Sequence, residues 1–276
     1  MKYLVDPKEL VQCEAKEGDI PMVLGSNQAI SFQSLNEVVD VMTEKLLTLQ
    51  KNGDHRVVFL HVYLIMTKEM QRRISSGFFL DPDWIERVLI GFAHYYFNAI
   101  EANEAGQPCP PAWELAFQFA TKKRGFVLQD ALLGINAHIN NDLPMALYLI
   151  LKEDRAWPDA RIMLRRRQDH DRINDVLHDL VDIAQDALAN YYDRFIRIID
   201  FLMGRRDEEL SSFILAYCRT NVWHDTELLL DASDDDQRSI QLKRIENNAY
   251  TMGLKIANSH AFPKFMASFA RKKQLF

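Results

Sequence analysis

Two side chains near the middle of the chain, His138 and Asp142, could act together in catalysis or hold a metal ion. They stand four residues apart, so on a continuous α-helix both project from one face, about 40° apart around the axis. An imidazole beside a carboxylate can serve as an acid–base pair, and both groups are common metal ligands. We therefore take His138 and Asp142 as candidate catalytic residues, together with Asn136.

More polar residues accompany this pair within residues 127–147, where the apolar residues otherwise recur at helical spacing. Asn136 and Asn140 carry amides that could bind a carbonyl or phosphate group of a substrate. The small residue Gly134 leaves room beside them, as a ligand pocket requires. A second interpretation is architectural, because polar side chains can bond the backbone groups that a kink before Pro144 leaves free.

The helical wheel of this stretch predicts one buried face with the polar residues at its edges. His138 and Asp142 fall on one flank of that face and Asn136 on the other. Polar groups at the rim of a buried face are placed to line a pocket. The residues predicted to form the buried face are Leu128, Leu132, Ile135 and Ile139.

A bound metal ion would need at least one further ligand besides His138 and Asp142. His61 lies in an apolar segment, Val57 to Met66, and is expected to be buried. It is the favoured third ligand or a general base, although a single buried histidine is more often a hydrogen-bonded core residue. The cofactor expected on this hypothesis is a divalent ion, Zn, Fe or Mn.

Three residues outside this stretch are candidates for substrate binding. Tyr96 lies on a predicted helix and could direct its hydroxyl into the pocket, whereas His94 on the same helix shares a side with charged residues and is expected in solvent. His170 and Asn174 begin a stripe of polar residues on a helix predicted from Asp169 to Met203. Only these two members of the stripe border the apolar face of that helix.

Composition limits the class of protein. The net charge of −6 argues against a dedicated nucleic-acid binder. The Arg161 and Arg165–Arg167 cluster is expected to be a solvated helix face, with an anion subsite as the alternative. The 3 cysteines form no metal-binding pairs, which fits a reducing compartment. The first residues lack the pattern of a signal peptide, and no apolar run approaches the ~20 residues that span a membrane, so a cytoplasmic protein is expected.

Helical periodicity runs through most of the chain, and hardly any stretch alternates as a strand would. Ser34 and Glu37 form a capping box, and Asp81 precedes a proline at a first helical position. We predict an irregular N-terminal arm over residues 1–33 and a single all-α domain over residues 34–276, a bundle of about eight to ten helices. Helices are predicted over residues 34–52, 56–74, 82–102, 113–121, 127–151 with a break at 144, 169–203, from 207 onward, and 237–258.

Several strings of this sequence together resemble the uncharacterised proteins of domain-of-unknown-function family 5995, over about residues 57–230. The most specific string is Gly-Ile-Asn-Ala-His-Ile-Asn at 134–140, followed by Asp-Leu-Pro at 142–144. The segment Phe59 to Ile65, Gly-Phe-Phe at 77–79 and Trp113 add to the similarity, and Arg219 with Trp223 echoes weaker family features. The resemblance implies one helical domain with its functional centre at the Asn-Ala-His-Ile-Asn string, and it implies no particular activity.

The string His-x-x-x-Asp followed by Leu-Pro is also similar to the metal-binding helix of zinc-dependent phospholipases C and related single-strand nucleases, which are all-helical. Those enzymes use further paired His and Asp motifs and an N-terminal Trp ligand, whereas this chain begins Met1-Lys2-Tyr3. This departure argues against a full trinuclear zinc site.

These observations favour an enzyme that hydrolyses or rearranges a small, partly apolar molecule, for instance as a tailoring step in biosynthesis. The partner expected is a small-molecule ligand, without nucleic acid and without a membrane span. Two alternatives stay open: a helical protein that binds a small ligand without turnover, and an interaction protein in which the polar string is architectural.

Overall fold

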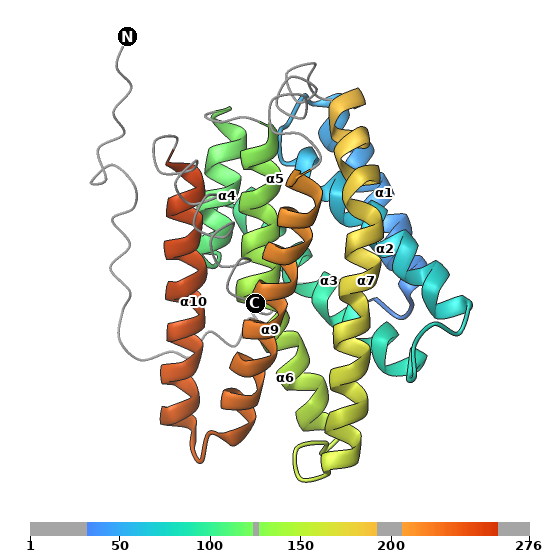
Figure 1. The fold of residues 1–276 in the computed structure, drawn as a ribbon. Helices are drawn as coiled ribbons and strands as arrows, with labels where there is room; N and C mark the ends of the chain where they lie inside the picture. The colour runs from blue at the N-terminus through green and yellow to red at the C-terminus, as the bar shows by residue number, and fades with distance from the viewer. Residues whose placement is uncertain (1–31, 124–126, 192–205, 259–276) are drawn as a thin grey trace.

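The computed structural model of the protein describes residues 32–123, 127–191 and 206–258, and these residues form helices joined by short loops (Figure 1). The all-α prediction is confirmed, and the number of helices falls in the predicted range, with nine α-helices and one π-helix in the described ranges. The predicted arm, residues 1–33, lies almost wholly outside the described residues, so the proposed division into an arm and one domain stays a prediction. The helices are α1 (Leu35–Lys51), α2 (Val57–Ser75), α3 (Pro82–Glu104), α4 (Pro111–Thr121), α5 (Val127–Asn136), η1 (Ala137–Asp142), α6 (Leu143–Glu153), α7 (Ala160–Tyr191), α9 (Arg206–Asp231) and α10 (Asp235–Ala257).

Side-chain caps start several of these helices where the sequence predicts them. Ser34 accepts a hydrogen bond from the backbone N–H of Glu37, and Glu37 in turn accepts one from the N–H of Gln33. Asp81 accepts one from the N–H of Trp84 at the start of α3, where Pro82 occupies the first turn. Local sequence therefore sets these helix ends before any tertiary packing.

The run α5–η1–α6 lies in the middle of the bundle, with α10 to one side and α7 to the other in Figure 1. α5 packs against α2, α4 and α10, and η1 contacts α3, α4, α9 and α10. Because helices cover this run on several sides, it has no wide solvent-facing surface. The hydrophobic core surrounds it and includes residues from Phe32 to Ile256.

The predicted buried face of this run is wrong in detail. Leu132, Ile135 and Ile139 are only partly buried, whereas Leu133 is 1% exposed and Asn136 is 4% exposed. The side chain of Leu128 lies outside the described residues. A helical wheel takes the most apolar stripe as the buried side, whereas here α10 packs on the side of Leu133 and Asn136, and Asn136 bonds the carbonyl of Ala249.

Two further predictions need correction. α7 begins at Ala160, and Asp169 lies inside it, where its carboxylate accepts hydrogen bonds from the backbone N–H groups of Leu80 and Asp81. Asp169 therefore anchors the loop before α3 and does not start a helix. His94 is not in open solvent, because it is half-buried, accepts a hydrogen bond from the N–H of Phe32 at 3.0 Å and stacks on its ring.

In the arginine cluster at the start of α7, Arg161 and Arg165 are exposed, as expected of a solvated helix face, whereas Arg166 and Arg167 are partly buried. Arg166 forms ion pairs with Asp81 and Asp154 and lies 5.0 Å from the ring of Trp84. Arg165 donates to the carbonyl of Leu80. In the described residues, no helix combines the length and the apolar character that crossing a membrane requires.

Candidate functional site

The six residues of η1 form a π-helical turn inside an otherwise α-helical run. The N–H of Leu143 bonds to the carbonyl of His138, five residues back. Pro144 explains the wider turn, because proline has no N–H to donate and its ring presses on the carbonyl four residues earlier, that of Asn140. Single π turns of this kind are often found at functional sites.

The structure brings His138 and Asp142 together on one face, as their spacing predicts. Nδ1 of His138 lies 3.1 Å from Oδ2 of Asp142. The same carboxylate accepts hydrogen bonds from Nε1 of Trp113 at 2.8 Å and from Nδ2 of Asn141 at 2.8 Å. The carboxylate of Asp142 therefore has three donors although the residue is only 1% exposed, which offsets the cost of burying its charge.

Aromatic rings enclose the imidazole of His138. The ring of Phe92 stacks on it with centroids 3.4 Å apart, and the ring of Tyr63 meets it edge-on at 4.3 Å. Phe59 and Trp113 follow at 5.6 and 5.9 Å. Burial lowers the pKa of His138 despite the opposing effect of Asp142, so the ring is neutral at pH 7.

One nitrogen in the buried cluster formed by His138, Asp142 and the surrounding rings has no hydrogen-bond partner among the described residues. A carboxylate cannot donate, so the neutral imidazole carries its proton on Nδ1, and Nε2 keeps its lone pair. In the part of the chain that the structure describes, Nε2 of His138 is buried and accepts no hydrogen bond. An imidazole oriented by a carboxylate through Nδ1, with Nε2 free, has the arrangement of a general base.

Tyr96, predicted to bind substrate, lies next to this cluster. It is fully buried, its ring centroid is 6.3 Å from that of His138, and its hydroxyl has no partner among the described residues. Burial raises the pKa of this phenol above its ordinary value, so the hydroxyl stays protonated and able to donate.

The side chains of Asn136 and Asn140 form hydrogen bonds that link α5 to α10 and to η1. Nδ2 of Asn136 donates to the carbonyl of Ala249 in α10 at 2.9 Å, and its Oδ1 accepts from Nδ2 of Asn140 at 2.9 Å. Asn136 is thus bonded at both ends of its amide. This arrangement supports the architectural interpretation for these two residues.

His170 and Asn174 belong to a second buried cluster, between α7 and α9. Nε2 of His170 donates to the carbonyl of Arg219 at 3.0 Å, and Oδ1 of Asn174 accepts from Nε of Arg219 at 2.9 Å. Burial lowers the pKa of His170 and brings that of Arg219 to about 9. No hydrogen bond or ring contact between described residues joins this cluster to His138.

His61 does not join His138 and Asp142. It is half-buried on α2, and among the described residues no group of three or more His, Cys, Asp or Glu side chains is placed to hold a metal ion. Each oxygen of Asp142 accepts at least one hydrogen bond, and Nε2 of His138 is the ligand atom of the pair that has no partner among the described residues. The three side chains thus form no metal-binding group within the described residues, and both the three-ligand set and a bound divalent metal stay predictions.

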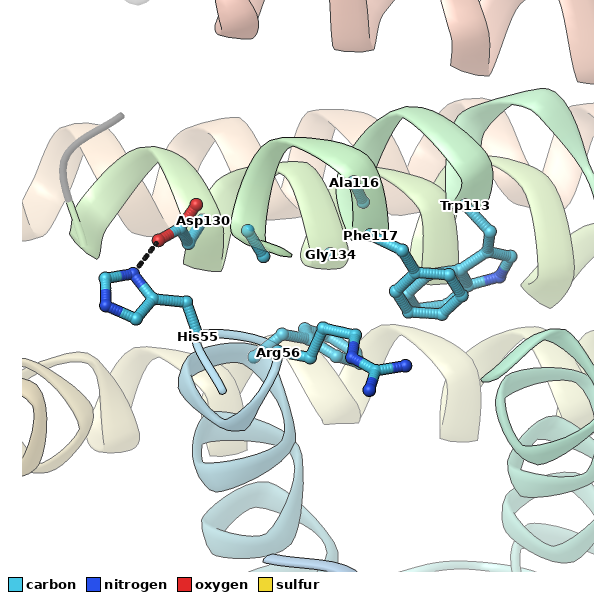
Figure 2. A pocket seen from close by; sticks show the side chains of 9 residues that line it. His55, Arg56, Trp113, Ala116, Phe117, Asp130 and Gly134 are labelled. Atoms are coloured by element: carbon cyan, nitrogen blue, oxygen red, sulfur yellow. Dashed lines mark hydrogen bonds and ion pairs between the residues drawn. The ribbon is translucent and has the colours of Figure 1, made fainter. Parts of the chain in front are cut away.

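A second imidazole–carboxylate pair, which sequence analysis missed, joins the turn before α2 to α5 (Figure 2). Nδ1 of His55, in the turn before α2, is 3.2 Å from Oδ2 of Asp130 in α5. The side chain of Asp130 is 1% exposed and that of His55 is 34% exposed. The other oxygen of Asp130, Oδ1, is buried and has no partner among the described residues.

This pair lines a hollow between α2, α4 and α5, which has room for about one water molecule. Phe59 and Trp113 line this hollow and also contact His138, so their rings separate the two pairs. Gly134 lets Phe59 lie against α5, because a Cβ there would be 2.3 Å from Cγ of Phe59. The lining residues are His55, Arg56, Phe59, Trp113, Ala116, Phe117, Ala120, Asp130 and Gly134.

One signal in the sequence could have pointed to Asp130. It is a lone carboxylate among the apolar residues that begin α5, one helical turn before Gly134, and so on the face where Phe59 packs. Its partner could not be found this way, because His55 is 75 positions away along the chain.

The fold is thus all-helical, and its central run contains a buried cluster of polar side chains around His138. Residues 35–259 match the family of unknown function DUF5995, and the chain belongs to this family. No curated protein and no solved structure matches the chain.

Proposed function

We propose that this protein is an enzyme that binds a small, partly apolar molecule and acts on it with His138 as general base. The observation that carries the proposal is Nε2 of His138, which is buried and has no partner among the described residues, while Asp142 orients the ring through Nδ1. A proton taken from the substrate, or from a water molecule that attacks it, would go to Nε2, and Asp142 would stabilise the resulting imidazolium. The reaction class is therefore hydrolysis or rearrangement.

The polar and apolar neighbours suit such a substrate. Phe92 and Tyr63 offer apolar surface to a ligand, and the unpartnered hydroxyl of Tyr96 is a donor for a substrate oxygen. Access requires the ring of Phe59 to turn, because this ring lies between the hollow and His138. The hollow would then be the entrance to the site.

A second candidate function is supported by Asp142 and Asn136, whose polar atoms all have hydrogen-bond partners. Asp142 accepts hydrogen bonds from three side chains, and Asn136 is bonded to α10. These bonds would be expected if the string only holds η1 in place against α4 and α10. In that case the chain would act as a non-catalytic binding or interaction protein.

Chemical modification separates these candidates. Diethyl pyrocarbonate acylates neutral imidazole, and peptide mass spectrometry reports the rate at each histidine. We expect His138 to react in folded protein, and about tenfold faster or more in Phe59→Ala, which opens the path from the hollow. His170 is the matched control, because it is equally buried but its Nε2 is bonded. A His138 that stays unmodified in both proteins would support the architectural role.

Stability measurements give an independent test. The variant His138→Gln removes the general base and keeps a polar amide. If the role is catalytic, the unfolding free energy should fall by about 1–2 kcal/mol while turnover of any identified substrate is lost. A loss of several kcal/mol would favour architecture.

The metal hypothesis has its own measurement. Zn, Fe or Mn near one per chain in gently purified protein, lost in the His138→Ala and Asp142→Ala variants, would support it. Nε2 of His138 would be the coordinating atom, with Asp142 fixing the orientation of the ring.

A further inference from the structure

The hollow beside His55 and Asp130 contains an unsatisfied buried acceptor. Oδ1 of Asp130 has no partner in the described part of the chain, and the side chain is 1% exposed. A buried carboxylate oxygen without a donor is costly, so the site favours any group that brings one. In Figure 2 only one oxygen of Asp130 is taken by His55.

The charges around the hollow favour a cation over a neutral donor. Arg56 is the one guanidinium in the lining, and it is already matched by two carboxylates. Its Nη2 lies 2.6 Å from Asp54, and its Nη1 lies 3.3 Å from Glu104. Glu104 is also paired with Lys45, at 2.6 Å, whereas Asp130 has no Arg or Lys partner among the described residues, so a ligand cation could take that place.

The size of the hollow and the chemistry of its lining residues further limit which ligands can bind. The hollow has room for a group of about the size of a water molecule, which is about the size of an ammonium head. The rest of the lining is mostly apolar, with Phe59, Phe117 and Ala116. An alkyl chain attached to the head would lie against these walls, and aromatic faces add attraction for a cation.

We infer that this hollow is a binding site for the ammonium head of a small primary amine, with Asp130 as its counter-ion. The ammonium donates to Oδ1, while Oδ2 keeps its bond to His55. The site concerns the hollow alone and does not depend on catalysis by His138. If the hollow is also the entrance to the buried pair, the substrate of the enzyme would carry an amine.

The test uses n-butylammonium chloride as the probe and follows backbone amide signals of the full chain by NMR at pH 7.5. We expect saturable shifts at His55 and Gly134. The neutral isostere of similar shape, n-butanol, should bind about tenfold more weakly or worse, because it lacks the charge. This comparison needs no variant, so it stands even if a substitution disturbs folding.

Variants locate the counter-ion. Asp130→Asn should weaken n-butylammonium binding by about tenfold or more, and Asp179→Asn, on a carboxylate outside the hollow, should leave it unchanged. His55→Gln keeps the carboxylate and should retain binding. His138→Gln should also retain binding, so failure of the catalytic proposal is distinguishable from failure of this one. Equal binding of n-butanol, equal binding by Asp130→Asn, or no saturable shift would overturn the inference.

Discussion

The two imidazole–carboxylate pairs of this protein, His138–Asp142 and His55–Asp130, have the same chemistry in different surroundings. Both carboxylates lie on the run α5–η1, and their distances to the imidazole nitrogen are 3.1 and 3.2 Å. Asp142 accepts hydrogen bonds from two further side chains, whereas one oxygen of Asp130 has no partner among the described residues. The two carboxylates therefore differ in how many hydrogen-bond donors surround them. We expect the carboxylate with three donors, Asp142, to contribute to folding stability, and the carboxylate with one, Asp130, to be able to accept a hydrogen bond from a ligand.

The largest expected effect is the loss of the carboxylate of the buried pair. Asp142→Ala leaves the donors of Trp113, Asn141 and His138 without an acceptor in the core, so we expect a loss of about 3–5 kcal/mol in unfolding free energy. Urea denaturation measures it. The matched change Asp130→Ala should cost about 1 kcal/mol or less, because Asp130 loses one partner only. Similar losses at both positions would break the comparison.

The next largest loss of stability is expected at Gly134, which packs against the ring of Phe59 between the two pairs. Gly134→Ala places a Cβ 2.3 Å from Cγ of Phe59, so we expect a loss of about 1–3 kcal/mol. Gly91→Ala in α3 is the control, because its Cβ would meet only Cδ1 of Ile150 at 3.5 Å. Alanine is the better helix former, so this control should be neutral or stabilising by up to about 1 kcal/mol. Thermal unfolding of both variants tests the contrast.

The two pairs should respond to pH with opposite signs. Burial raises the pKa of Asp130 from 3.8 to about 6, so folded protein binds more protons than unfolded protein between these values. Stability from this group is present below 3.8 and lost as the pH rises through about 6, by about 1–3 kcal/mol. Burial lowers the pKa of His138 below 6.5, so its contribution is present above 6.5 and lost on acidification.

Unfolding free energies at several pH values between about 4 and 8 test these signs. The difference between wild type and Asp130→Asn should shrink toward low pH, and His138→Gln should be less sensitive to acid than wild type. His55 lies 3.2 Å from Asp130, so a third curve, measured on His55→Gln, separates the effect of this contact from that of the carboxylate. Parallel curves for Asp130→Asn and wild type would contradict the raised pKa.

The smallest effect is expected at the partly exposed imidazole. His55→Ala removes one hydrogen bond from a side chain that is 34% exposed, so stability should fall by about 1 kcal/mol or less. Chemical denaturation at pH 7.5 measures it. A loss as large as that of Asp142→Ala would mean that the His55–Asp130 pair contributes as much to folding stability as the His138–Asp142 pair.

Much of the helical fold is predictable from local sequence. The caps at Ser34 and Asp81 start α1 and α3 where their residue types predict, because a side-chain oxygen satisfies N–H groups within its own turn. The start of α7 was predicted wrongly at Asp169, because the same side chain can bond backbone groups of a distant loop. Local signals do not distinguish these two uses of a carboxylate.

The candidate site divides in the same way. The common helix face of His138 and Asp142 follows from the sequence alone, since a spacing of four residues places them together in any helical run. The packing of the helices is what puts the pair at the centre of the bundle, brings Nε1 of Trp113 to the carboxylate of Asp142, and brings His55 to Asp130. Those contacts depend on which helices pack against α5 and η1, and packing of distant segments leaves no periodic trace in one sequence.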